Sequence, residues 1–137
     1  MEFDIMNISA SGMTANRLRI DVISDNIANA ETTRTPEGGP YKKKIPVFAE
    51  YIKRGLNGNK LAGVRVVKIV QDPSYKLVYD PTHPDADKDG YVKMPNVNVL
   101  KEMVDLINAQ RAYEANVTAF NTVKSMINSA LGIGRGA

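Results

Sequence analysis

One segment of the chain has residue types and spacing that could bind a cation: Asp85-Ala86-Asp87-Lys88-Asp89-Gly90. Carboxylates at positions 1, 3 and 5 of a loop, followed by glycine at position 6, open the calcium loops that lie between two helices. Position 12 of such a loop should be a bidentate glutamate, but it is Asn96 here, and prolines occupy positions 84 and 95 of the chain. An Asp-rich turn is therefore the favoured interpretation. A calcium-binding helical module using Asp85, Asp87 and Asp89 stays open as the alternative function.

The other candidate reactive residues are isolated. The single histidine, His83, lies in a proline-rich segment, and Asp80 and Ser74 could be drawn with it as orienting acid and nucleophile. Their spacing gives no support to such a site. The basic triplet Lys42–Lys44 follows Tyr41 and could contact phosphate or an RNA base, but a lone triplet is typical of a solvated strand edge. We therefore predict no enzyme, no cofactor and no metal site, and a nucleic-acid binder is the weakest alternative.

Composition narrows the class of protein further. The chain has 137 residues, 43% of them apolar, which suits one domain or one domain with an appendage. Its 18 basic and 15 acidic residues give a net charge of +3, too balanced to indicate a polyanion partner. The absence of cysteine excludes disulfides, thiolate nucleophiles and cysteine-based metal sites. No apolar run approaches the roughly 18 residues of a membrane span, so we expect no direct membrane insertion. The acidic start Met1–Asp4 lacks the features of a cleaved signal peptide.

A first helix is predicted from about residue 3 to residue 30. Apolar residues recur there at alternating spacings of three and four, the pattern of a seam against another helix. Asn29 can end this helix in a left-handed conformation, before a Thr-rich segment with Pro36. The predicted seam residues are Met6, Met13, Ile20 and Ile27.

A second helix is predicted from about residue 98 to residue 131. Asn96 or Asn98 can cap its start, and Gly132 and Gly134 are expected to end it. A second apolar stripe lies beside its seam. The predicted seam is Val99, Met103, Leu106, Tyr113, Val117, Phe120, Ile127 and Leu131, and the neighbouring stripe is Leu100, Val104 and Ile107.

The segment between the helices holds most of the proline and glycine. Residues 64–70 are largely β-branched and are predicted to form a strand, and residues 43–48 and 76–79 are weaker candidates. Pro46 would confine its strand to a sheet edge. About three short strands make a unit that is not stable alone.

The predicted fold is mainly α with a small β insert, its long terminal helices packed as an antiparallel coiled coil. Residues 1–30 form the N-terminal helix, residues 31–95 an extended arm and small β-rich insert, and residues 96–131 the C-terminal helix; 1–30 with 96–137 form one coiled-coil domain. The N-terminal helix also has a second stripe, Ala15, Leu18 and Val22. One seam within the chain leaves these second apolar stripes uncovered, and uncovered stripes indicate a partner. Heterologous contacts between subunits close into rings or open into helical filaments, so we expect an assembly.

Motifs near both ends of the chain resemble those of the flagellar rod and hook axial proteins. Residues 24–30, Ser-Asp-Asn-Ile-Ala-Asn-Ala, resemble the N-terminal signature of that family. Residues 97–104 and 109–116 resemble its C-terminal helix. Residues 32–41 and 79–92 are similar to the connecting segments of its proximal rod subunits. The residues that carry the resemblance include Asn26, Ala28, Asn29, Tyr79, Asp80, Pro81, Asn98, Arg111, Glu114 and Asn116.

The resemblance implies a structural subunit of the proximal rod of the bacterial flagellar basal body. Such a subunit would assemble helically with other proximal and distal rod proteins, transmit torque and line the export channel. The resemblance also implies export through the flagellar type III apparatus without a cleaved signal peptide, a periplasmic location, and contact with the junction between the export gate and the MS ring. In this family the terminal helices line the inner tube and the middle segment lies outside.

Overall fold

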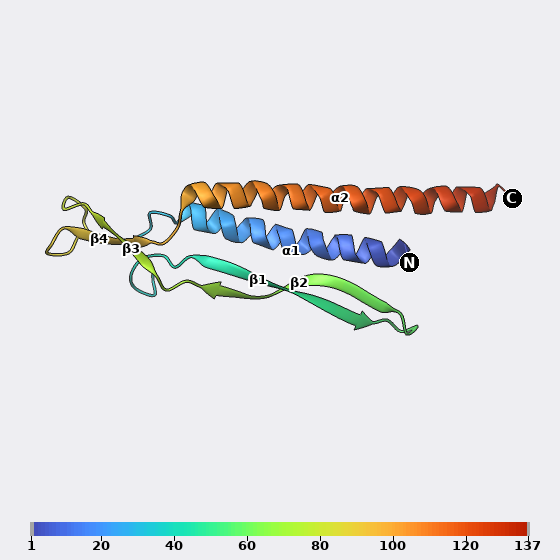
Figure 1. Ribbon diagram of the computed structural model, residues 1–137, viewed down its shortest axis with the longest axis horizontal. Coiled ribbons are helices and arrows are strands. Elements are labelled where there is room, and N and C mark those ends of the chain that lie inside the picture. The colour runs from blue at the N-terminus through green and yellow to red at the C-terminus, as the bar shows by residue number, and fades with distance from the viewer. Residues whose placement is uncertain (1, 137) are drawn as a thin grey trace.

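The computed structural model describes residues 2–136, so the outermost residues of the predicted helical domain, Met1 and Ala137, lie outside it. The fold is mainly helical with a β insert, as predicted, and the molecule is elongated (Figure 1). The elements in chain order are α1 Glu2–Ala28, β1 Lys44–Arg54, β2 Lys60–Gln71, β3 Tyr75–Tyr79, β4 Tyr91–Pro95 and α2 Val99–Arg135.

The two helices lie side by side and run in opposite directions (Figure 1). Asn98 caps α2 as predicted, because its side chain accepts a hydrogen bond from the Lys101 backbone N–H. With 37 residues against 27, α2 projects past the start of α1, where it has no neighbouring element (Figure 1). Within residues 2–136, no other helix or strand therefore packs on the last turns of α2.

Two predicted helix ends are wrong. Gly132 and Gly134 do not stop α2, which continues to Arg135 and has Gly136 as its C-cap. Neither glycine takes the positive φ of a helix-ending glycine, and a glycine inside a helix costs only about 1 kcal/mol. Asn29 is not left-handed either, since no non-glycine residue from 2 to 136 has a positive φ. Instead its backbone N–H and its side-chain amide both donate to the Asp25 carbonyl.

The strands form two separate antiparallel hairpins, β1–β2 and β3–β4. The three predicted strands are all present, but β1 and β2 are longer than expected and β4 was missed. In a two-stranded sheet each strand is an edge, which accommodates Pro46 in β1. The β1–β2 hairpin runs along α1 on the side away from α2 (Figure 1), and Ser11 Oγ accepts a hydrogen bond from the Val64 N–H. Packing on α1 is what allows this long hairpin to persist.

The buried core is thin, because α1 is the element covered on two sides. Most of its apolar side chains are no larger than valine, and three polar residues are buried as well: Ser9, Asn26 and Glu102. At Gly12 the helices come so close that an added Cβ would lie 2.9 Å from the side-chain amide of Asn116. The buried apolar residues are Ala15, Val22, Ile23, Tyr41, Val92, Val97, Ala109 and Val123.

On α2, the face toward α1 is rotated from the predicted seam. Its buried residues are Glu102, Ala109 and Val123, which recur at multiples of seven. Hydrophobic periodicity detects large side chains, whereas helices in close approach bury small ones between them. Of the predicted seam residues, those that are half-buried are Leu106, Tyr113, Val117, Phe120 and Ile127 on α2 and Met6, Met13, Ile20 and Ile27 on α1, and those that are exposed are Val99, Met103 and Leu131.

Candidate assembly site

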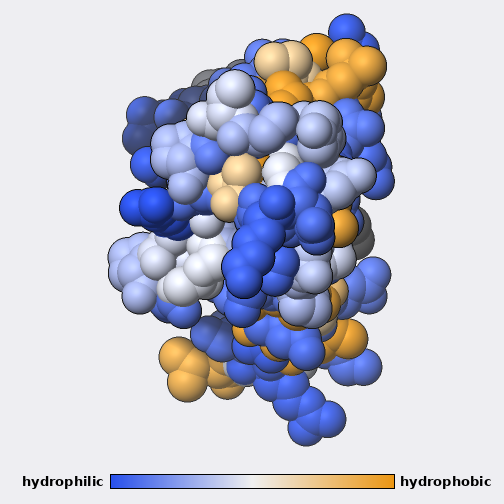
Figure 2. Space-filling model, turned by 90° about the vertical axis from the view of Figure 1, so that its left-hand side faces the viewer, coloured by the Kyte–Doolittle hydropathy of each residue, from blue (hydrophilic) through white to orange (hydrophobic). Residues whose placement is uncertain are grey.

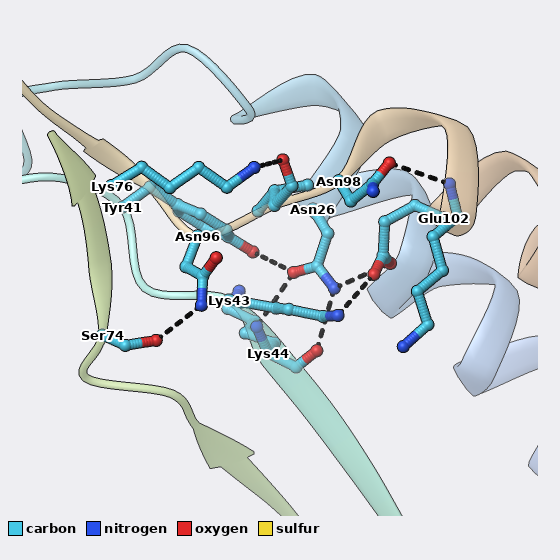
Figure 3. Close-up of polar contacts among 11 residues, drawn as sticks. Asn26, Tyr41, Lys43, Lys44, Ser74, Lys76, Asn96, Asn98 and Glu102 are labelled. Atoms are coloured by element: carbon cyan, nitrogen blue, oxygen red, sulfur yellow. Dashed lines mark hydrogen bonds and ion pairs between the residues drawn. The ribbon is translucent and has the colours of Figure 1, made fainter. Parts of the chain in front are cut away.

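A buried side-chain amide on α1 joins three parts of the chain (Figure 3). Asn26 is 1% exposed, and its Nδ2 donates to the Lys44 carbonyl at 2.9 Å and to Glu102 Oε2 at 3.2 Å. Its Oδ1 accepts from the Tyr41 hydroxyl and the Lys44 N–H, both at 2.9 Å. All donors and acceptors of this amide are thus used. The end of α1, the start of β1 and the first turn of α2 are held together through one residue.

The basic triplet is not a solvated edge as predicted. Lys43 Nζ lies 2.7 Å from Glu102 Oε1, and Glu102 is only 2% exposed (Figure 3). Lys44 Nζ lies 3.2 Å from Asp25 Oδ2 at the surface and also approaches the Tyr41 ring. Only Lys42 of the triplet is exposed. A buried carboxylate of this kind requires partners. The sequence analysis did not predict a role for Glu102, because a charge was not expected on the packed face of α2.

The free energy of unfolding should depend on pH through the hydroxyl of Tyr41. Burial raises its pKa from 10.0 to about 12, with Asp25 and then Glu102 adding to the effect. Because the pKa in the folded state is raised, the stabilisation is present below pH 10 and is lost as the pH rises toward 12. We expect the free energy of unfolding to fall through this window more steeply in the wild type than in Tyr41→Phe, by up to about 1.4 kcal/mol per pH unit. Urea titrations at several pH values measure both slopes, and equal slopes would contradict the assignment.

Two hydrogen bonds fix the segment that precedes α2 (Figure 3). Lys76 Nζ donates to the Val97 carbonyl at 3.1 Å, and Asn96 Nδ2 donates to Ser74 Oγ at 2.8 Å. Ser74 Oγ in turn donates to Asp72 at 2.7 Å. The base of the β3–β4 hairpin is therefore tied to the start of α2.

The Asp-rich segment is a turn in which the carboxylates of Asp85 and Asp87 accept hydrogen bonds within the chain. Asp85 accepts from the Thr33 hydroxyl at 2.6 Å and from Arg34, and these two contacts, in that order, lower its pKa. Asp87 accepts the backbone N–H groups of Asp89 and Tyr91, both at 2.9 Å. Within residues 2–136, no three acidic or histidine side chains converge on a metal-sized site. Nothing here supports the calcium-loop alternative.

The residues that could be drawn as a catalytic group have separate partners. His83 Nδ1 accepts from the Asp85 N–H at 3.0 Å, and Asp80 accepts from the Thr82 hydroxyl at 2.6 Å. This contact with Thr82 is the main cause of the lowered pKa of Asp80. Ser74, as described above, is bonded to Asp72 and Asn96. The arrangement is that of capped turns rather than of a nucleophile and its base.

The residues that carry the family resemblance fall into structural and exposed groups. Asn26 is the buried hub, Asn98 caps α2, and Asn116 packs against Gly12. Tyr79 packs edge-on against the Tyr91 ring, with centroids 5.3 Å apart. Asp80 accepts a hydrogen bond from the Thr82 hydroxyl, and the Asn29 side chain donates to the Asp25 carbonyl at the end of α1. The exposed residues of the set are Ala28, Pro81, Arg111 and Glu114.

Both helices expose apolar side chains that the described part of the chain leaves largely open to solvent. On α2, Leu100 is 74% exposed near the start and Leu131 is 61% exposed in the projecting end. Val104 and Ile107 continue the Leu100 stripe, and Ile5 and Ile8 are exposed on α1. Figure 2 views the end of the molecule that carries the β3–β4 hairpin. Hydrophobic side chains gather at its upper edge, on the side where α2 lies in Figure 1, and others lie at its lower edge, on the side of the β1–β2 hairpin.

The surface area of the molecule also indicates that neighbouring subunits cover part of it. The accessible surface is 9738 Å² for a chain of 15.0 kDa, whereas a compact monomer of that mass exposes roughly 7,000 Å². The helices between residues 2 and 136 do not combine the length and apolarity that crossing a membrane requires. The excess surface and its apolar stripes are those of a subunit that is incomplete alone.

Comparison with known proteins identifies the family. The sequence model described as "Flagella basal body rod protein" matches residues 6–34, and the one described as "Flagellar basal body rod FlgEFG protein C-terminal" matches residues 88–133. A flagellar basal-body rod protein FlgC of Borreliella burgdorferi is 49% identical, with 98% of each chain covered. The FlgC of Bacillus subtilis is 47% identical over 97% of this chain and 98% of its own, and that of Escherichia coli is 42% identical over 96% and 97%. Since this identity extends over nearly the whole length, the chain belongs to the FlgC family of flagellar basal-body rod proteins.

Proposed function

We propose that the chain is a structural subunit of the proximal rod of the flagellar basal body, where it assembles helically with other rod proteins, transmits torque and surrounds the export channel. The observation that carries the proposal is the large accessible surface, 9738 Å², with apolar stripes on both helices. Membership of the FlgC family supports the rod as the place where those stripes are covered.

The helix pair is the element that would form the rod wall. We infer that residues 1–30 and 96–137 act as one domain, packed as an antiparallel coiled coil, and that residues 31–95 lie outside it. The heptad recurrence of Glu102, Ala109 and Val123 toward α1 supports coiled-coil packing. The half-buried and exposed seam residues then flank this contact, where they are available to neighbouring subunits.

Subunit packing is assigned to side chains that the chain leaves partly uncovered. Large apolar residues that are open on one side gain most when a neighbour buries them, at about 25 cal/mol for each Å². The residues proposed to pack between subunits are Met6, Met13, Ile20 and Ile27 of α1 with Val99, Met103, Leu106, Tyr113, Val117, Phe120, Ile127 and Leu131 of α2.

The role of rod subunit also implies where the protein lies and how it is exported. A rod subunit lies in the periplasm, and we propose that the flagellar type III apparatus exports this chain without cleaving a signal peptide. Its partners would be the neighbouring proximal and distal rod proteins and the junction of export gate and MS ring. The protein performs no catalysis in this role and uses no cofactor.

Immunolabelling of basal bodies tests the proposal. An epitope inserted in the β1–β2 turn, between Gly55 and Asn59, should leave the helix pair intact, because that turn lies at the far end of the hairpin (Figure 1). We expect electron microscopy of basal bodies from the bacterium that encodes the chain to show antibody label on the membrane-proximal rod. A hook protein that carries the same epitope serves as the control for position, since its label should lie on the hook and not on the rod. Intact basal bodies without label, from cells that express the tagged chain, would refute the function.

A further inference from the structure

We propose that Asn57, in the β1–β2 turn, is a site of spontaneous covalent modification that converts it to isoaspartate and aspartate. The proposal does not depend on the role of the chain in the rod. It rests on the residue that follows Asn57, on the exposure of the turn and on the hydrogen bonds that close it.

The reaction needs only the chain itself and water. The backbone nitrogen of Gly58 attacks Cγ of Asn57, the bond from Cγ to Nδ2 breaks, and the amide leaves as ammonia with the proton of the Gly58 N–H. A five-membered succinimide ring remains, and water opens it at either carbonyl. Opening at the main-chain carbonyl gives isoaspartate, and opening at the side-chain carbonyl gives aspartate. The net change replaces an amide by a carboxylate.

The sequence and the exposure of the turn favour this attack at Asn57. It is the only asparagine of the chain that glycine follows, and glycine has no Cβ to hinder approach to its backbone nitrogen. Asn57 and Gly58 are both exposed. Gly58 has a φ of 76°, and a Cβ added there would meet open space. Other parts of the protein therefore leave the two reacting groups unhindered.

One hydrogen bond in the folded turn opposes the reaction. The Gly58 N–H donates to the Gly55 carbonyl at 3.0 Å, and the Gly55 N–H donates to the Asn59 carbonyl at 2.7 Å. The turn must release the Gly58 nitrogen before that nitrogen can attack. Because the net strength of one exposed hydrogen bond corresponds to a factor of about five, the folded turn slows the reaction without preventing it.

Other segments protect their candidate residues more strongly. Asn128 precedes the small residue Ser129, but both lie within α2, and attack there would require the helix to unwind. Asp89 precedes Gly90, but its carboxylate is a poorer leaving group than an amide. Gly90 is also buried, and the Tyr79 ring lies 2.9 Å from a Cβ added to it. Asn57 should therefore react before either of them.

The product changes both the charge and the geometry of the turn. A carboxylate at position 57 adds a negative charge close to Arg54 and Lys60, which are exposed and pair across the hairpin. Isoaspartate also lengthens the main chain by one methylene carbon between Gly55 and Asn59. The start of β1, which the Asn26 amide holds, lies at the other end of the hairpin (Figure 1). The change is therefore confined to the turn, and the helix pair should keep its fold.

Ageing of the purified, untagged full chain tests the proposal. The chain is kept at mildly alkaline pH, because hydroxide promotes loss of the proton from the Gly58 nitrogen, and is then digested with trypsin. Cleavage after Arg54 and Lys60 releases residues 55–60 as one peptide. We expect the mass of this peptide to rise by about 1 Da with time, as an amide becomes a carboxylate. We also expect isoaspartyl methyltransferase to label it.

Two substitutions in the same peptide locate the reaction. Asn57→Gln keeps an exposed amide but would have to form a six-membered ring, so the mass shift and the isoaspartate label should both be lost. Asn59→Gln is the matched control, because Asn59 is an exposed asparagine in the same turn that lysine follows. It should leave both signals at the wild-type level. Signals that persist in Asn57→Gln, or that disappear in Asn59→Gln, would overturn the assignment.

Unfolding in guanidinium chloride measures the protection that the turn gives. We expect Asn57 to be modified about fivefold faster in the unfolded chain than in the folded one, the factor set by the hydrogen bond from Gly58 to Gly55. Modification of Asn57 in the unfolded chain alone would overturn the proposal, because the folded turn would then protect the residue completely. Faster modification of Asn128 or Asp89 than of Asn57 in the folded chain would overturn it as well.

Discussion

Asn26→Ala is expected to destabilise the folded chain by roughly 4 kcal/mol, one of the largest effects of any single truncation in this protein. The side chain is 1% exposed and makes four hydrogen bonds, to Tyr41, Glu102 and both backbone groups of Lys44. Substitution by alanine removes the amide and so breaks all four hydrogen bonds. The groups that were bonded to it then stay buried without this partner. Urea unfolding of the soluble chain, followed by far-UV circular dichroism, measures the loss.

Asn7→Ala is the matched control, because Asn7 is an exposed asparagine on the same helix. It should stay within about 0.5 kcal/mol of the wild type. If Asn26→Ala behaved like Asn7→Ala, the hub would contribute nothing and the network would be incidental.

Asn26→Asp distinguishes the hydrogen-bond network from simple packing, because the two side chains have nearly the same volume. An aspartate keeps the acceptors but loses the donors that reach the Lys44 carbonyl and Glu102. It also places a second carboxylate beside a buried one, and two like charges in one site repel. We expect a loss at neutral pH at least as large as that of alanine, with partial recovery when Glu102→Gln is added.

The hub also explains which parts of the fold could be predicted from sequence. The long helices and the β2 strand were predictable, because their signal is periodicity over many residues. Asn98 was predictable as a cap because capping is a local property of the first turn. The Lys43–Glu102 pair was not, because it joins segments that are far apart in sequence and become neighbours only after folding.

The prediction of which α2 face packs on α1 was wrong for a related reason. Large apolar residues define a hydrophobic stripe, but Gly12 and Ala109 show that the helices approach through small residues. A signal was present in the sequence: Glu102, Ala109, Asn116 and Val123 recur every seven residues. A stripe that mixes a charge, an amide and small side chains is not recognised by hydropathy alone.

Gly12→Leu is the second change with a large expected effect. A Cβ at this position would lie 2.9 Å from Nδ2 and Oδ1 of Asn116, so leucine must push the helices apart. Overpacking of this kind costs about 1–3 kcal/mol. We expect urea unfolding to show a loss at the upper end of that range, and basal bodies from cells that express the variant to contain few labelled rods.

The control for helix propensity is Gly132→Leu, which lies in the projecting end of α2 with no atom near its added Cβ. Leucine forms helix better than glycine by about 0.5–1 kcal/mol, so this variant should be no less stable than the wild type. A loss as large as that of Gly12→Leu would show that leucine itself, rather than the close approach of the helices, is harmful.

The decisive comparison is between Gly12→Ala alone and Gly12→Ala combined with Asn116→Ala. Asn116 is held in place by a hydrogen bond from its Nδ2 to the Ala112 carbonyl at 3.0 Å, so it cannot simply swing away from a new methyl group. Removing its amide opens the space, and two alanines then add helix propensity on both sides of the contact. The double variant should therefore recover or exceed wild-type stability, while the single variant does not. Restored stability without restored rod assembly would mean that the spacing of the two helices is set for the neighbouring subunits as well as for the fold, since the apolar stripes that flank this contact move whenever the helices do.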